Sequence, residues 1–318
     1  MILLDFKESN ETMVERFYSK YQPLITRKHQ TCVGLGFELL SRLNKLNKKY
    51  SGIANGLYLV SCEETIGDIE AYVGGPPAAD SGEKEHVLVC LKIVINGRRG
   101  VLLLDPGYHV ARVVTVMADK LYPHTGWFTQ SDEPECKKEY NYSLCQNDND
   151  YVEWHERQTR PGALEQTQVA LIYVARPYLT AIDVTERRNL VYNYRSLVSR
   201  DTKGHVTAAL YFSLGLDNIQ TFTIFYRTSN GTKRKIKIPF NKFSSTTKTG
   251  PTDEELQMIA ECGRQMDMSC DEIDSLLEAL AQVTSDTSFI AQVLAINAKI
   301  NTPVQNQPTI SSLFRYFS

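Results

Sequence analysis

The hydrophobic pattern of the chain changes its period twice, from helical to strand-like and back to helical. Between residues 8 and 50, apolar side chains recur at the three- and four-residue spacing of amphipathic helices. Pro23 is expected to break this region, and a second helix is predicted to begin near Cys32. Leucines at positions 35, 39, 40, 43 and 46 follow helical spacing, so this second helix should be buried along one side.

From Leu57 the period becomes that of β-strands. Asn96-Gly97 separates two of the apolar runs, and this dipeptide favours a two-residue hairpin turn because both residues tolerate positive φ. Residues 74–85 are rich in glycine and proline and are expected to form an exposed loop. Strands are predicted at residues 56–60, 69–73, 87–95, 101–105, 168–174, 206–214, 221–226 and 233–238.

Beyond a Ser/Thr/Gly-rich linker at residues 244–252, the helical pattern returns. Thr252 with Glu255, and Ser269 with Glu272, have the spacing of capping boxes that begin helices. A third helix is expected at residues 286–300.

The predicted fold class is α+β, with a helical N-terminal lobe, a β-barrel or sheet in the middle and a helical C-terminal segment. The tail is interpreted as either a docking peptide or a terminal element packed on its own domain. The expected domains are residues 1–56 (helical lobe), 57–243 (β-rich), 253–300 (helical) and 301–318 (tail).

Composition narrows the class of protein. The 318 residues include 35 Lys and Arg against 37 Asp and Glu, and the net charge of −2 gives no overall reason to expect nucleic acid or an anionic membrane as a partner. The basic run at residues 233–237 is interpreted as the solvated face of a strand. No stretch approaches the ~18 apolar residues of a membrane span, and the N-terminal residues lack a signal-peptide pattern.

Cysteine usage points to a reducing compartment. The seven cysteines are scattered and contain no Cys-x-x-Cys pair, which argues against a disulfide framework and a zinc site. His109, His124 and His155 have no metal-ligand spacing with them. Trp127 and Trp154 are interpreted as core residues. We therefore expect a cytoplasmic protein without a metal.

A complete catalytic arrangement is formed by Cys32, His86 and Asp105. A cysteine at a helix N-terminus lies near unpaired backbone N–H groups, which stabilise the thiolate. If the strands on either side of Asn96-Gly97 pair antiparallel, His86 lies beside Asp105. His86 could then accept the thiol proton while Asp105 orients the imidazole. Taken singly, a helix-start cysteine is most often a small buried residue and an Asp-Pro-Gly after a strand is most often a turn. Their joint occurrence, in this order and on these elements, favours a catalytic site.

Three segments resemble the core of arylamine N-acetyltransferases, within the wider transglutaminase/papain-like group of thiol enzymes. They read TCVGLGFELLSRL from Thr31, EHVLVCLKI from Glu85, and VLLLDPGY from Val101. The resemblance implies a cysteine-protease-like fold with Cys32, His86 and Asp105 as nucleophile, base and orienting acid. It is divergent, because His29-Gln30-Thr31 stands where the family has Arg-Gly-Gly. Residues 177–197 also look like a later strand of that family.

This resemblance implies ping-pong acyl transfer from acetyl-CoA, or another acyl-CoA, to an amine or hydroxyl acceptor. The acceptor would be a small molecule or a protein partner. Backbone N–H groups of Cys32 and Val33 would bind the oxyanion, and Gly107 and Tyr108 would line the substrate pocket.

Two alternatives remain open from the sequence. The same triad would serve a thiol peptidase or transglutaminase-like enzyme that attacks an amide. A pseudoenzyme could instead bind a protein partner through the former active-site cleft. The oligomeric state cannot be read from the sequence.

Overall fold

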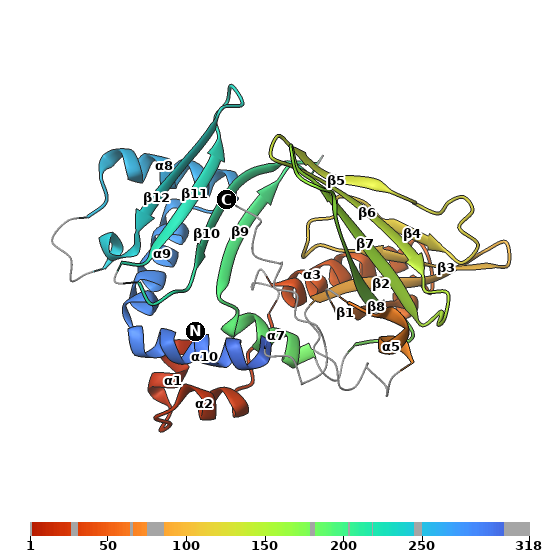
Figure 1. Ribbon diagram of the computed structural model, residues 1–318, viewed down its shortest axis with the longest axis horizontal. Coiled ribbons are helices and arrows are strands. Elements are labelled where there is room, and N and C mark those ends of the chain that lie inside the picture. The colour runs from red at the N-terminus through yellow and green to blue at the C-terminus, as the bar shows by residue number, and fades with distance from the viewer. Residues whose placement is uncertain are drawn as a thin grey trace. The chain divides into compact units, whose positions relative to one another are not determined.

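The computed structural model describes residues 2–26, 31–63, 66–74, 86–178, 182–202, 204–217, 219–244 and 250–301 (Figure 1). The fold is mixed α+β, with antiparallel sheets and helices towards both ends of the chain. The expected tail at residues 301–318, apart from residue 301, lies outside the described residues, as do residues 75–85 of the expected loop.

The chain divides into two compact units. The large-sheet unit has its described residues within Pro23–Glu186, and the small-sheet unit lies within Met1–Gln22 and Arg187–Thr302. This division differs from the one expected from the sequence, because the late strands group with the C-terminal helices and the first helices instead of with the earlier strands. Shared hydrophobic contacts explain the grouping: Ile224 of a late strand packs in one cluster with Ile259 and Leu277 of the helices.

The large-sheet unit contains one antiparallel sheet of eight strands in the order β4-β3-β2-β1-β8-β7-β6-β5. The sheet curls, so that β4 and β6 come into contact although five strands separate them in the order. The strands are β1 (Leu57–Glu63), β2 (His86–Ile95), β3 (Arg98–Leu104), β4 (Val114–Met117), β5 (Phe128–Glu133), β6 (Cys136–Leu144), β7 (Tyr151–Thr159) and β8 (Gln166–Tyr173).

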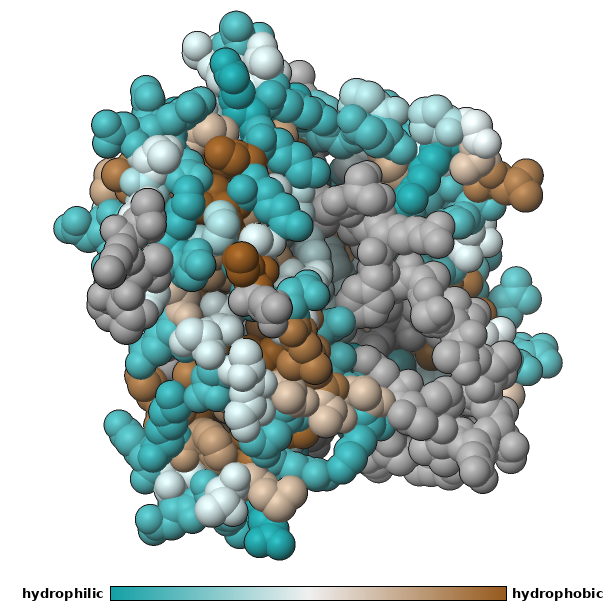
Figure 2. Space-filling view, turned by 60° about the vertical axis from the view of Figure 1, so that its left-hand side comes forward, coloured by the Kyte–Doolittle hydropathy of each residue, from teal (hydrophilic) through white to brown (hydrophobic). Residues whose placement is uncertain are grey.

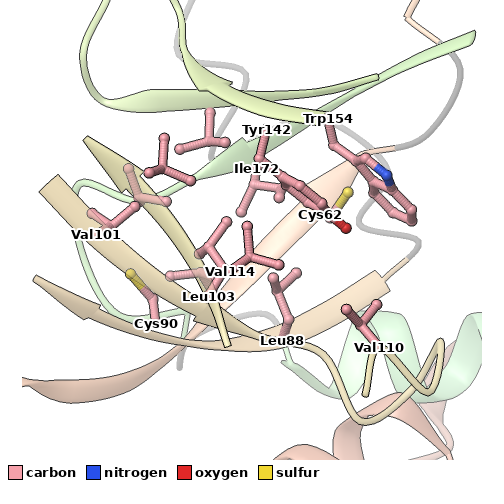
Figure 3. Close-up of a cluster of buried hydrophobic side chains, with 14 of the residues drawn as sticks. Cys62, Leu88, Cys90, Val101, Leu103, Val110, Val114, Tyr142, Trp154 and Ile172 are labelled. Atoms are coloured by element: carbon pink, nitrogen blue, oxygen red, sulfur yellow. The ribbon is translucent and has the colours of Figure 1, made fainter. Parts of the chain in front are cut away.

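Alternate residues of these strands fill the inside of the curl. Leu88 and Cys90 of β2 point inward together with Ile172 and Trp154 from the other half of the sheet (Figure 3). Because side chains of a strand alternate between its two faces, Val87 and Val89 lie on the outside of the curl. Burial on both faces explains why residues 87–90 read as a continuous apolar run.

Helix α3 (Cys32–Asn44) covers the outer face of β1 and β2. A Cβ atom on Gly36 would lie 2.9 Å from Leu59 Cδ2, so glycine at this position lets the helix approach the sheet closely. The expected hairpin is confirmed: β2 and β3 pair from Ile95↔Arg98 to Val89↔Leu104, and Asn96 and Gly97 both have positive φ. This helix and this hairpin together position the candidate site.

Two strand predictions are wrong. Residues 69–73 form helix α5 (Ile69–Val73), which begins at Asp68, whose carboxylate accepts a hydrogen bond from Ala71 N. The segment at 177–197 contains helix α7 (Ile182–Val191) before β9 begins. The remaining short helices are η1 (Lys45–Lys48) and α4 (Ile53–Gly56).

The small-sheet unit has a four-stranded antiparallel sheet in the order β12-β11-β10-β9. Helix α8 packs on β10 and β11 (Figure 1). Both predicted capping boxes are confirmed, at the starts of α8 and α9. The elements are α1 (Ile2–Glu8), α2 (Val14–Lys20), β9 (Tyr194–Arg200), β10 (Val206–Ser213), β11 (Thr221–Arg227), β12 (Lys233–Pro239), η2 (Phe240–Phe243), α8 (Asp253–Gln265), α9 (Cys270–Ser285) and α10 (Thr287–Asn301).

Figure 2 shows one face on which hydrophobic residues gather in several separate groups among hydrophilic ones. Among the helices that the structure describes, none combines the length and apolar character needed to cross a bilayer. All seven cysteines lie among the described residues and are free thiols.

Candidate active site

Cys32 is the first residue of α3. Thr31 is the N-cap of this helix: its hydroxyl oxygen accepts a hydrogen bond from Gly34 N at 3.1 Å, and its hydroxyl donates to Glu186 Oε1 at 3.1 Å. The N-cap satisfies one of the backbone N–H groups that a helix start leaves without an intrahelical partner. Glu186 is itself buried. The cap and its buried partner therefore fix the position of Cys32, whose thiol is half-buried.

His86 is the first residue of β2. It pairs with Cys62 of β1 across the sheet, and strand alternation places its side chain on the same face as Leu88 and Cys90. The residue is 3% exposed. His86 therefore lies at the inner edge of the curled sheet, on the face that carries the apolar cluster.

Asp105 directly follows β3 and begins a tight turn. Its Oδ1 accepts a hydrogen bond from Tyr108 N at 2.9 Å, and its backbone oxygen accepts one from Val110 N at 3.0 Å. His109 adopts a left-handed φ of 53° in this turn. The buried Gln130 of β5 donates to the backbone oxygens of Tyr108 (3.2 Å) and His109 (3.4 Å). Gln130 thus fixes the turn from the other half of the sheet.

His86 and Asp105 form a buried hydrogen-bonded pair, with Nε2 and Oδ2 2.9 Å apart. A carboxylate oxygen can only accept, so Nε2 carries the hydrogen and Nδ1 is left for Cys32. Rotation of the Asp105 carboxylate is restricted, because its other oxygen accepts a hydrogen bond from the backbone N–H of Tyr108. The pair therefore fixes both the tautomer and the orientation of the imidazole.

Gly107 shows how closely Cys32 approaches this pair. A Cβ atom added to Gly107 would lie 2.7 Å from His86 Cε1 and 2.9 Å from Cys32 Cβ. Both side chains therefore border the same small space beside the turn, and Cys32 contributes to raising the pKa of His86. The structure brings together the three residues that the sequence singled out.

The charge of Asp105 changes the protonation of His86. Burial lowers the pKa of His86, but the Asp105 carboxylate, through its charge and its hydrogen bond, and Cys32 raise it. The net pKa is well above the usual 6.5. The imidazolium form of His86 is thus favoured at neutral pH.

Aromatic side chains adjoin the pair. The Tyr108 ring lies 4.2 Å from the His86 ring and 5.4 Å from that of Trp154, measured between centroids. Tyr108 is 37% exposed, whereas Trp154 is buried in the core beside Tyr142 (Figure 3). Burial, followed by the nearby Asp105 charge, raises the pKa of Tyr142 well above 10, so this phenol stays protonated.

Of the other predicted site residues, Tyr108 and Gly107 border the site, whereas the side chain of Val33 does not. Tyr108 presents an exposed ring beside His86, which fits a pocket-lining position, and Gly107 borders both His86 and Cys32. Val33 is fully buried between α3 and the sheet, so its side chain does not line a substrate pocket.

Thr31, Gln130 and Glu186 belong to the site but were not predicted. Thr31 had a readable signal, because a threonine directly before an apolar helical run is a preferred N-cap. Gln130 and Glu186 are distant in sequence, at 21 and 155 residues from their partners, and local pattern gives no signal for such pairs.

The sequence predicted no metal centre, and the described residues can be searched for groups of metal-ligating side chains. Within them, no three His, Cys, Asp or Glu side chains gather in a way that could hold an ion. His124 Nδ1 instead accepts a hydrogen bond from Met117 N, and His155 pairs with Glu153.

Comparisons of the chain with protein-family models, curated proteins and solved structures found no match. The functional argument therefore rests on the geometry of the site and on the sequence resemblance.

Proposed function

We propose that this protein is an acyltransferase of the cysteine-protease-like class that uses Cys32, His86 and Asp105 as a catalytic triad. The observation that carries the proposal is the meeting of Cys32 and His86 beside Gly107, with His86 held by the buried Asp105. A thiol, a base and an orienting carboxylate in this order are the requirements of covalent thiol catalysis.

The first half-reaction would form a thioester on the enzyme. His86 holds the proton of the Cys32 thiol, and the thiolate attacks the thioester carbonyl of an acyl-CoA. The bond between Sγ and the acyl carbon forms, the bond from that carbon to the sulfur of coenzyme A breaks, and the leaving thiolate takes the proton from His86. Cys32 is left acylated and the free coenzyme departs.

The second half-reaction would release the acyl group. An amine or hydroxyl acceptor attacks the acyl carbon while His86 takes its proton, and the bond to Cys32 Sγ breaks. Negative charge develops on the carbonyl oxygen in both steps. The hydrogen bond from Leu35 N to Thr31 O closes the first turn of the helix. The N–H groups of Cys32 and Val33 precede this bond, in the part of a helix where backbone donors have no intrahelical partner. These two groups form the proposed oxyanion hole.

Acyl-CoA as donor is supported by the likeness of the three triad segments to arylamine N-acetyltransferases. The exposed ring of Tyr108 beside His86 offers an apolar surface for the acceptor. The acceptor can be a small amine or alcohol or a side chain of a protein, because the same transfer step applies to both. A cytoplasmic location is part of this proposal, since acyl-CoA and a reduced thiol would both be present there.

Intact-mass spectrometry after incubation with acetyl-CoA tests this proposal. The expected result is one acetyl group on the wild-type protein and none on Cys32→Ala, with coenzyme A released in equal amount. Cys270→Ala is the matched control, because Cys270 also begins a helix, and it should acetylate as wild type does.

The other outcomes separate the alternatives. Rapid alkylation of Cys32 by iodoacetamide without any acetyl adduct would overturn the acyl-CoA proposal in favour of an amide-directed thiol enzyme. A Cys32 thiol inert to both reagents would overturn catalysis altogether and leave a binding protein.

A further inference from the structure

The small-sheet unit contains a marked segregation of charge. Between Asp217 and Asp253 the chain has no acidic residue, although it carries Arg227, Lys233, Arg234, Lys235, Lys237, Lys242 and Lys248. The next segment reverses the sign: Arg264 is the one basic residue among the acids Asp253, Glu254, Glu255, Glu261, Asp267, Asp271, Glu272, Asp274 and Glu278. The overall charge of −2 conceals this separation.

Strand register gathers most of the cations on one side of the β11–β12 hairpin. The pairs Arg227↔Lys233, Phe225↔Lys235 and Thr223↔Lys237 place these residues on one face, since paired residues point to the same side. The alternate pairs, such as Ile224↔Ile236, point to the other face and pack in the core with α8 and α9 (Figure 1). The acidic helices and the lysines thus lie on opposite sides of the hairpin.

These lysines are exposed, and two of them lie over aromatic rings. Lys233 Nζ is 6.0 Å from the centre of the Phe225 ring, and Lys235 Nζ is 5.9 Å from that of Tyr211. Within the described residues, neither Lys235 nor Lys237 forms an ion pair. Lys242, by contrast, is paired with Glu255 of α8. The hairpin face therefore presents the positive charges of Lys235 and Lys237 beside a half-buried Phe225 ring.

We infer that this face of the β11–β12 hairpin binds single-stranded nucleic acid. The lysine side chains would contact phosphates, and the half-buried Phe225 ring, once Lys233 leaves it, would be open to stacking with a base, which is how sequence-tolerant binders hold a single strand. A duplex keeps its bases stacked inside and could use only the charges. An anionic membrane would likewise use the charges but gain nothing from a flat, half-buried ring.

Fluorescence anisotropy of a labelled oligothymidylate with the full-length protein at low salt tests the inference. The double variant Lys235→Glu/Lys237→Glu should weaken binding by roughly tenfold or more, and loss of two phosphate contacts should lower the slope of log affinity against log salt by about 1.4. The matched control Lys45→Glu/Lys48→Glu reverses two exposed lysines of η1 and should bind nearly as wild type does.

Phe225→Leu separates stacking from charge. It should weaken binding by roughly fivefold or more while leaving the salt slope unchanged. Cys32→Ala should bind as wild type does, because the inference does not depend on the triad.

Three results would overturn the inference. The first is no binding at low salt, and the second is equal loss in both lysine variants. The third is preference for duplex DNA or for phosphatidylserine vesicles over the oligothymidylate, which would assign the face to a different polyanion.

Discussion

Two helices of this protein begin in the same way, with a cysteine directly after a hydroxyl-bearing N-cap. Thr31 precedes Cys32 in α3 and Ser269 precedes Cys270 in α9, and each cap oxygen accepts a hydrogen bond from the backbone N–H three residues on, at 3.1 and 3.3 Å. Both thiols therefore experience the N-terminus of a helix more than three turns long.

Their surroundings differ. Cys32 is half-buried beside His86, and no acidic residue lies in the first turn of its helix. Cys270 is exposed and is followed by Asp271 and Glu272. The helix N-terminus is thus common to the two thiols. The turn after β3, which brings the His86–Asp105 pair against Cys32, makes the difference.

The largest expected effect comes from removing the base. His86→Gln keeps an amide donor for Asp105 but cannot take a proton, so the rate of acyl transfer from acetyl-CoA should fall by about 10²–10⁴-fold. The rate is followed as the release of coenzyme A, which is measured with a thiol reagent after the protein has been removed. Unchanged turnover would contradict the role of His86.

Filling the space beside Gly107 should come next. In Gly107→Ala the new Cβ lies within 3.0 Å of both His86 and Cys32, so one of them must shift. A displacement of this size at the reacting atoms costs roughly 10²-fold in rate. Gly67→Ala is the matched control, because nothing lies within 4 Å of its added Cβ. Equal activity of both variants would show that Cys32 and His86 need not meet.

The raised pKa of His86 predicts a pH-dependent contribution to stability. Because the folded protein holds this proton more tightly than the unfolded chain, the contribution is complete below pH 6.5 and is lost as the pH rises through the folded pKa. The free energy of unfolding of wild type relative to His86→Gln should therefore fall above pH 6.5, by at most about 1.4 kcal/mol per pH unit. Urea denaturation at several pH values checks the slope, and a rising difference would contradict the sign.

The two N-caps offer the smallest and most closely matched test. Thr31→Ala and Ser269→Ala should each lower the free energy of unfolding by about 1 kcal/mol, because each removes a hydrogen bond at a helix start. Only Thr31→Ala should also slow the reaction of Cys32, since Thr31 anchors that helix to Glu186. Slowing by both variants would indicate a general loss of stability.

Features with strong local signals were predicted from the sequence. The Asn96-Gly97 hairpin, the Thr252 and Ser269 capping boxes and the helix at Cys32 were readable because each depends on residues close in the chain. The hairpin also carried the juxtaposition of His86 and Asp105, since register follows from turn length.

Features that depend on distant contacts were missed. Strand β7 places Glu156 on the buried side of the sheet, so its alternation of apolar and polar residues is broken. The five residues of α5 are too few for periodicity to separate a helix from a strand. Gln130 reaches the Asp105 turn only because the sheet curls, and the curl results from long-range packing.

The most direct test of the central claim is to measure the rate of iodoacetamide alkylation at Cys32 and at Cys270 in the same wild-type sample between pH 5 and pH 9, by peptide mass spectrometry. If the His86 imidazolium holds a thiolate beside it, Cys32 should react at least about tenfold faster than Cys270 at pH 6, despite its lower exposure. The advantage should disappear in His86→Gln. Equal or slower reaction of Cys32 across the whole range would contradict the account.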